Sequence, residues 1–230
     1  MHVVECTSTQ DMALRDPEPG CAAYWADHQT RGRGRQGRVW YDEPAQDVTV
    51  TFRLDGVEPE KPWRLPAAIP IAVLRALERL ATLHATLKWP NDVMVAGRKL
   101  AGILIDADGN PPRYAIGIGV NVGRTSFPAE LLDSATSLAL LTGREFAREA
   151  VVEELALALD QTVTSLLTGD VADLLATFRA RSELIDREVE IEAGNRRETG
   201  RVVDVDLDQL TLAEGRRVPL AVVQTIRRRG

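Results

Sequence analysis

The hydrophobic pattern of the chain changes near Asp186, and this change constrains the fold more than any other feature. Before it, strand-like runs are interspersed with long segments whose apolar residues recur at helical spacing. After it, short β-rich runs (REVEIEA, ETGRVVDVD, QLTLA, AVVQTI) alternate with turn signals at Gly194-Asn195 and Glu214-Gly215, a pattern typical of a small β-barrel. We therefore predict an α+β protein with two domains, residues 1–186 and 187–230.

The first domain is predicted to be a β-sheet with helices packed on it. Expected strands span residues 21–25, 47–54, 100–105 and 114–122, with a hairpin turn near 96–97. Expected amphipathic helices span residues 66–83, 151–166 and 171–181. The strand at 47–54 (DVTVTFRL) alternates apolar and polar residues, as a strand between two different environments does.

A short helix is predicted over residues 10–14, ending before Pro17. Ser8 and Thr9 precede it and are typical helix N-caps. Small polar side chains are therefore expected at a helix N-terminus.

Composition excludes several classes of protein. Hydrophobic residues make up 44% and charged residues 27% of the chain, which is ordinary for a globular protein. No stretch approaches the roughly 20 apolar residues of a membrane span, and MHVVECTSTQ lacks the features of a signal peptide. Two cysteines and three histidines show no metal-ligand spacing. We expect a cytoplasmic protein that has reduced thiols and does not bind membranes.

Positive charge is concentrated in one segment of an acidic chain. The net charge is −6, yet four arginines alternate with three glycines in Thr30–Arg38 (TRGRGRQGR). Glycines let a backbone approach a ligand closely, and guanidinium groups pair with carboxylates and phosphates. Taken alone, the segment fits an anion-binding loop, a solvated charged loop or a nucleic-acid-binding arm. It is neither a Walker loop nor a dinucleotide-binding fingerprint.

Four further segments give the loop a context. They are STQ (Ser8–Gln10), KWPND (Lys88–Asp92), KLAGIL (Lys99–Leu104) and GIGVNV (Gly117–Val122). In this order around the loop they resemble the biotin–protein ligases, whose pattern GRGRxGRxW matches Gly32 to Trp40 at every fixed position. The resemblance runs from about Thr7 to the C-terminus. It implies a mixed β-sheet flanked by helices, similar to class II synthetase catalytic domains, and a C-terminal SH3-like barrel.

The resemblance implies a two-step reaction. Biotin and ATP give biotinyl-5'-AMP and pyrophosphate, and a lysine of a biotin carboxyl carrier domain then attacks the adenylate. Two anions must meet in the first step, so cations rather than a protein nucleophile are required. Magnesium usually binds one or two carboxylates together with substrate phosphates, which makes Asp92 the expected Mg²⁺ partner.

Site residues follow from the resemblance position by position. Expected catalytic residues are Lys99, Arg35 and Arg33. Expected biotin-binding residues are Ser8, Thr9, Gln10, Gln29, Arg33, Gly34, Arg35, Lys99, Gly102 and Gly119, with Gly117 and Gly119 leaving room for the biotin rings. Expected ATP-binding residues are Arg35, Arg38, Trp40, Lys88, Asn91 and Asn121.

Structural alternatives stay open for several of these residues. Trp40 is expected to stack on adenine, but it could be a core aromatic residue. Lys99 could be a solvated hairpin lysine, and Ser8 and Thr9 could act only as helix caps. Trp89 is expected to belong to the core.

Two departures from the family pattern bear on function. Gln10 stands where the family commonly has Asn, which leaves its biotin contact open. Only six residues precede Thr7, so we expect no DNA-binding domain and no nucleic-acid partner.

Three further expectations complete the interpretation. A lipoate or octanoate ligase or transferase is the nearest alternative. The arginine-glycine loop is expected to be mobile and to close over the adenylate, because ordering it without an anion costs backbone entropy. An exposed strand edge would allow a homodimer.

Overall fold

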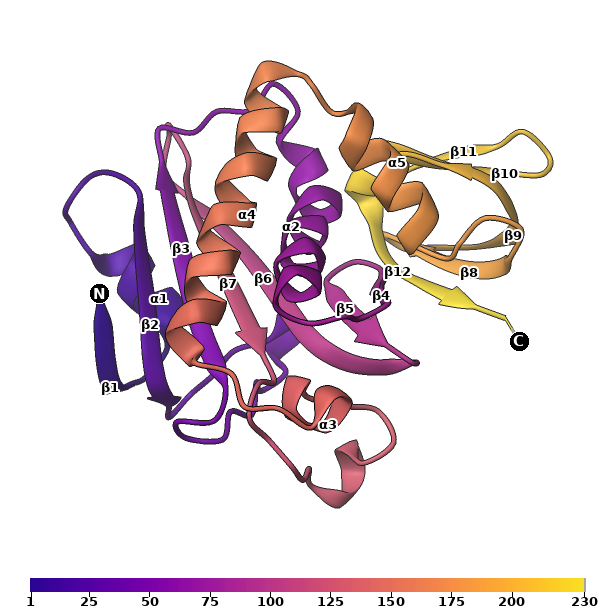
Figure 1. Ribbon diagram of the computed structural model, residues 1–230. Coiled ribbons are helices and arrows are strands. Elements are labelled where there is room, and N and C mark those ends of the chain that lie inside the picture. The colour runs from indigo at the N-terminus through magenta and orange to yellow at the C-terminus, as the bar shows by residue number, and fades with distance from the viewer. Residues whose placement is uncertain (230) are drawn as a thin grey trace.

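A computed structural model describes residues 1–229, and a seven-stranded mixed sheet forms its centre (Figure 1). The strand order is β1-β2-β3-β7-β6-β5-β4, in which β1 and β2 are parallel and the other neighbours antiparallel. The strands are β1 (His2–Cys6), β2 (Ala22–Gln29), β3 (Val48–Asp55), β4 (Ala85–Lys88), β5 (Asp92–Val95), β6 (Arg98–Asp108) and β7 (Arg113–Val120).

Two long helices cover one face of this sheet (Figure 1). They are α2 (Leu65–Leu80) and α4 (Arg148–Thr168), which pack on each other and form one apolar core with the sheet. The helix predicted over 66–83 ends at Leu80, because Ala81 adopts extended geometry. The remaining helices are α1 (Thr9–Arg15), α3 (Leu138–Thr142) and α5 (Ala172–Arg181).

Strand β3 separates the core from the opposite face. Val48, Val50 and Phe52 belong to the core shared with α2 and α4, whereas Thr49 and Thr51 are on the other side of the strand. The predicted alternation is therefore present. Its polar side is nevertheless buried, because α1 and the walls of a cavity cover it.

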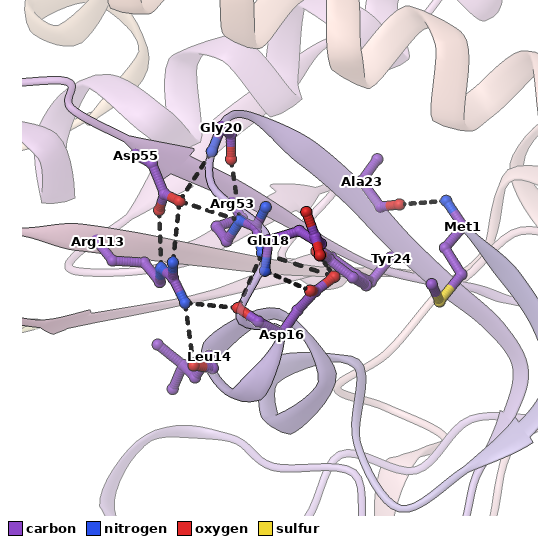
Figure 2. Close-up of polar contacts among 10 residues, drawn as sticks. All are labelled: Met1, Leu14, Asp16, Glu18, Gly20, Ala23, Tyr24, Arg53, Asp55 and Arg113. Carbon is purple, nitrogen blue, oxygen red and sulfur yellow. Dashed lines mark hydrogen bonds and ion pairs between the residues drawn. The ribbon is translucent and has the colours of Figure 1, made fainter.

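The C-terminal end of α1 is tied to the sheet by the polar network in Figure 2. Arg113 donates to both carboxylate oxygens of Asp55 and to the backbone oxygen of Asp16. Tyr24 donates to the Asp16 carboxylate at 2.5 Å, and the fully buried Arg53 donates to the backbone oxygen of Gly20. The network fixes α1, and with it the polar residues at the opposite end of this helix.

A five-stranded antiparallel sheet follows, in the order β11-β10-β9-β8-β12, as expected of an SH3-like domain. Its strands are β8 (Glu188–Ala193), β9 (Arg196–Val205), β10 (Gln209–Leu212), β11 (Arg217–Pro219) and β12 (Val223–Arg228). The sheet begins two residues after Asp186. One apolar core runs through residues 1–186 and 187–230. The division of the chain into these two domains therefore stays a proposal.

Asp208, in the turn between β9 and β10, connects the C-terminal part to the segment just before α2. Its carboxylate accepts two hydrogen bonds from Arg64, at 2.6 and 2.8 Å, and one from the Trp63 indole at 2.9 Å. The hydrogen bond from Arg64 lowers the pKa of this carboxyl to about 2. In addition, the Trp89 indole donates to the backbone oxygen of Val223. These contacts hold the β9–β10 turn and the start of β12 against the first domain.

Within residues 1–229, no helix has the length and apolar character that crossing a membrane requires.

Candidate active site

A cavity of about 340 Å³ opens on the polar face of the central sheet. Its walls come from the start of α1, the arginine-glycine loop, β3, the β4–β5 turn, β6, β7 and β12. The predicted site residues that line it are Ser8, Thr9, Gln10, Gln29, Arg33, Gly34, Arg35, Arg38, Trp40, Lys88, Asn91, Asp92, Lys99, Gly102 and Gly119. The fold thus brings together segments that lie far apart in the sequence.

The cavity is strongly cationic. Among the described residues its lining contains one carboxylate, Asp92, and six basic side chains: Arg33, Arg35, Arg38, Lys88, Lys99 and Arg227. Lys99 Nζ lies 2.6 Å from Asp92 Oδ1. Burial lowers the pKa of Arg35, an effect opposed by the nearby Asp92 and reinforced by Arg38. This charge balance suits a ligand that carries several negative charges.

The arginine-glycine loop folds as a tight hairpin. Gly34 N–H donates to Arg38 O at 2.7 Å, and Trp40 N–H donates to Gly32 O at 3.0 Å. A Cβ at Gly32 would lie 2.5 Å from the backbone oxygen of Trp40, and Gly37 has a φ of +73°. Gly32 therefore permits the close approach of the two arms, while Gly37 permits the turn.

Trp40 lies on the glycine floor of the cavity. A Cβ at Gly119 would overlap the indole, and one at Gly102 would lie 3.0 Å from it. The space left by Gly119 is therefore filled by Trp40, rather than left open for a ligand as the sequence had suggested. The indole Nε1 is buried and has no hydrogen-bond partner among the described residues. A ligand acceptor near Nε1 would satisfy it.

One end of the cavity carries small polar groups. Gln29 Oε1 accepts a hydrogen bond from the backbone N–H of Thr9 at 2.8 Å, and the Thr9 hydroxyl lies 3.1 Å from the same oxygen. The amide nitrogen of Gln29 consequently remains as a donor at the cavity wall. Ser8 is the N-cap of α1 but makes no side-chain cap hydrogen bond, so capping does not account for its hydroxyl.

Gln10 lines the cavity, but protein groups engage the atoms of its side-chain amide. Its Nε2 donates to the backbone oxygen of Ala115 at 2.9 Å and to Asp106 Oδ2 at 3.1 Å. Its Oε1 accepts from the Thr51 hydroxyl at 3.1 Å and would lie 2.5 Å from a Cβ at Gly117. Protein groups therefore use both of its amide protons, and the room above Gly117 is taken by Gln10.

The structure does not bring Asn121 to the cavity. Its buried amide donates to the backbone oxygens of Thr136, at 2.9 Å, and of Lys99, at 3.3 Å. The Lys99 N–H in turn donates to the Ser134 oxygen. Asn121 therefore fixes the backbone at Lys99, in place of the nucleotide contact predicted for it.

Arg33 lies at the cavity but is already paired. Its Nη2 donates to Asp11 Oδ1 of α1 at 2.6 Å. The pair connects the first arm of the loop to α1, so a carboxylate ligand would compete with Asp11 for this guanidinium.

The KWPND segment divides its side chains between cavity and core. Asn91 lines the cavity while its Nδ2 donates to the Ile103 oxygen at 3.0 Å, and Lys88 is exposed at the rim. Trp89 packs edge-on against Phe178, as expected of a core residue, although part of it also reaches the cavity.

Sequence reasoning missed the contribution of β12. Thr225, Ile226 and Arg227 line the cavity from the C-terminal sheet. Arg227 Nη1 also lies 3.3 Å from Glu192 Oε1. A run of three basic residues at 227–229 was the available signal, but nothing local to it indicates that β12 reaches the first domain.

The donor set limits what metal could bind. Among residues 1–229 no group of three or more His, Cys, Asp or Glu side chains is arranged to hold an ion. Asp92 alone, with a carboxylate at the cavity, fits a Mg²⁺ ion whose other ligands are substrate phosphates and water.

Comparison with solved structures defines the class of fold. The biotin protein ligase from Aquifex aeolicus, solved in complex with biotin and ATP, is similar with a TM-score of 0.89 and 26% identity. The similarity covers 100% of this chain and 98% of that chain. Biotin protein ligase from Leishmania major, in complex with biotinyl-5-AMP, shares the fold with a TM-score of 0.67 and 20% identity, over 100% and 97% of the chains. The fold is therefore that of the biotin protein ligases.

Sequence comparison places the chain in a family. The profile of the biotin/lipoate A/B protein ligase family matches residues 5–122. A biotin–[acetyl-CoA-carboxylase] ligase of Mycobacterium tuberculosis is 34% identical over 187 residues, which are 79% of this chain and 68% of that protein. The chain belongs to the biotin/lipoate A/B protein ligase family.

The bifunctional ligase/repressor BirA of Bacillus subtilis is also 34% identical, over 149 residues. That similarity covers 62% of this chain but only 46% of the relative, so the chain spans about half the length of this bifunctional protein.

Proposed function

We propose that this protein is a biotin–protein ligase that activates biotin with ATP and transfers it to a lysine of a biotin carboxyl carrier domain. The observation that carries the proposal is one cavity in which six basic side chains surround a single carboxylate. The carboxylate of biotin and the phosphates of ATP repel each other, and such a cavity offsets that repulsion. The names of the relatives support this choice of substrates.

In the first step, a carboxylate oxygen of biotin attacks the α-phosphorus of ATP, and the bond to the bridging oxygen of pyrophosphate breaks. Lys99 and Arg35 stabilise the charge that accumulates on the phosphoryl oxygens. Asp92 holds the Lys99 ammonium at 2.6 Å and keeps it directed into the cavity.

In the second step, the lysine amine of the carrier attacks the acyl carbon of biotinyl-5'-AMP. The bond between the acyl carbon and the phosphate oxygen breaks, AMP leaves, and the amine loses a proton to become an amide. The leaving group is stable enough for this step to need no protein nucleophile.

The remaining ligand contacts belong to the proposal. Biotin occupies the end of the cavity formed by Ser8, Thr9 and Gln29, and ATP occupies the end with Arg38, Lys88 and Asn91. Trp40 separates the two ends and stacks on the adenine. Asp92 would hold a Mg²⁺ ion bound to the phosphates, and the ion would neutralise part of their negative charge.

The proposal extends to the acceptor, the location and the assembly of the protein. The carboxylase named in relatives supports a biotin carboxyl carrier domain as acceptor. We place the protein in the cytoplasm. The outer edge of β1 is a strand edge through which a second copy could pair to form a homodimer.

The test is incubation with biotin, ATP, Mg²⁺ and an acceptor domain, followed by mass measurement of the acceptor. We expect a mass increase equal to one biotin amide, and none with Lys99→Ala. Pyrophosphate exchange in the presence of biotin, lipoate or octanoate then defines the substrate. Exchange driven only by lipoate or octanoate would overturn the proposal.

A further inference from the structure

A chain of hydrogen bonds runs from Asp106, which does not line the cavity, to Thr9, which does. We propose that Asp106 is a positioning residue, acting through Gln10 and Thr51 to make the Thr9 hydroxyl an acceptor for a ring N–H of biotin. The inference rests on the proposed function and deepens it, since it explains how the end of the cavity formed by Ser8, Thr9 and Gln29 recognises the ureido ring.

The first step is the orientation of the Gln10 amide. One of its terminal atoms lies 2.9 Å from the backbone oxygen of Ala115 and 3.1 Å from Asp106 Oδ2. A backbone oxygen and an ionised carboxylate accept hydrogen bonds and cannot donate them. The terminal atom must therefore be the nitrogen, with one proton for each acceptor, and Oε1 must face Thr51.

The second step is the direction of the hydroxyl hydrogen bonds. Gln10 Oε1 can only accept, so the Thr51 hydroxyl donates to it across 3.1 Å. A threonine hydroxyl has one proton, and that of Thr51 is now used. The Thr9 hydroxyl also lies 3.1 Å from Gln29 Oε1. Because Thr51 has no proton left for the shorter, 2.8 Å contact between the two hydroxyls, the Thr9 proton must lie in that contact.

The third step concerns the hydrogen-bonding groups that Thr9 and Gln29 leave available to a ligand. With its proton directed to Thr51, the Thr9 hydroxyl presents lone pairs to the cavity. The neighbouring Gln29 presents its amide nitrogen, because its oxygen accepts from the Thr9 backbone N–H at 2.8 Å. An acceptor next to a donor is complementary to a ring N–H next to a carbonyl, as found in the ureido group.

Burial gives this arrangement its effect. Thr9, Gln10 and Thr51 are at most 4% exposed. If the hydroxyl of Thr9 or Thr51 pointed the wrong way, water could not easily replace the lost hydrogen bond. Gly117 is part of the same design, because a Cβ there would lie 2.5 Å from Gln10 Oε1. The half-buried Asp106, paired with Ala115 in the β6–β7 ladder, supplies the charged acceptor that holds the far side of the amide.

Calorimetric titration of the full chain with biotin, and separately with ATP, tests the inference. Asp106→Ala should raise the Kd for biotin about five- to tenfold, which corresponds to the net contribution of one ordinary hydrogen bond, and leave the Kd for ATP within about twofold. Asp106→Asn retains an acceptor oxygen and should stay within about twofold of the unsubstituted protein for both ligands.

A double-substitution cycle separates positioning from general loss of structure. Thr51→Val removes the hydroxyl in the middle of the chain with little change in volume. In that background Asp106→Ala should have almost no further effect on the Kd for biotin. Additive effects of the two substitutions, or equal losses of biotin and ATP binding, would overturn the inference.

The outcomes also distinguish this inference from the proposed function. If the unsubstituted protein binds biotin and Asp106→Ala binds it equally well, the positioning role is wrong and the proposed function stands. If the unsubstituted protein does not bind biotin, both are overturned.

Discussion

Lys99 Nζ and Asp92 Oδ1 lie 2.6 Å apart on adjacent strands of the same hairpin, at the wall of the cavity. The backbone of Lys99 is fixed from the other side by Asn121 and Ser134. Both the ammonium group and the backbone of Lys99 are therefore held in place. A cation fixed in this way stabilises developing charge without reorganising during the reaction.

Replacing Lys99 by Ala is therefore expected to reduce adenylate formation at least about 100-fold. Pyrophosphate exchange with biotin and ATP measures the effect, and thermal unfolding should show little change, because the side chain is 31% exposed. Arg98→Ala, a neighbouring basic residue on β6 that does not line the cavity, is the matched control. An exchange rate close to that of the control would remove Lys99 from the mechanism.

Placing a methyl group at Gly119 should displace Trp40. The added Cβ of Gly119→Ala would occupy the position of the indole, and we expect at least a tenfold loss of adenylation. Combining it with Trp40→Leu provides the control, because a smaller side chain removes the overlap. In the Trp40→Leu background, Gly119→Ala should cause little further loss of adenylation. A full further loss there would show that Gly119 acts through something other than Trp40.

The mobility predicted for the arginine-glycine loop can be measured by hydrogen exchange. The structure shows the loop as a hairpin with backbone bonds at Gly34 and Trp40. Repulsion among its arginines favours opening when no anion is bound, so these two amides should exchange more slowly once biotin and ATP are added. Amides of α4 serve as the internal reference. Equal protection of the loop with and without ligands would contradict a closing lid.

Asp208 should make the contact between the C-terminal part and the segment just before α2 sensitive to acid. Its pKa is about 2 in the folded protein and about 3.9 in an unfolded chain. A lowered folded pKa contributes stability above about pH 4, and this contribution is lost as the pH falls towards 2. Because the carboxylate is 33% exposed, we expect about 1–2 kcal/mol after allowing for solvent screening.

Asp208→Asn should accordingly lower the Tm at neutral pH by a few degrees. The difference from the unsubstituted protein should shrink between pH 4 and pH 2. Asp204→Asn is the matched control, since Asp204 also pairs with an arginine, Arg179, but both side chains are 48% exposed. A Tm difference for Asp208→Asn that stayed constant across this range would rule out the ion pair as its cause.

Sequence periodicity predicted the long elements well and the short ones poorly. The helices α2, α4 and α5 and the strands β3, β6 and β7 were recognised because their apolar residues repeat over enough turns or pleats. Strands β1 and β11 and helix α3 were missed, as segments of three to five residues carry too little pattern.

The sequence motifs located most of the candidate site. They could not predict contacts between parts of the chain that are far apart in the sequence. The resemblance brought Lys99, Asp92, Arg35 and the loop to one place, as the cavity lining bears out. It could not show that Arg227 arrives from another sheet, because that contact is purely tertiary. Nor could it show that Gln10 directs its amide at protein acceptors, since those acceptors belong to strands about 100 residues away.

The two sides of β3 have a consequence for how substitutions would be tolerated along it. Phe52 supports the apolar core, and Thr51, the residue before it, belongs to the wall of the cavity. A scan of this strand should therefore switch at each step between variants that unfold more easily and variants that fold normally but bind poorly. Selection for stability and selection for substrate recognition act on alternate positions of one strand, so each can change with little cost to the other.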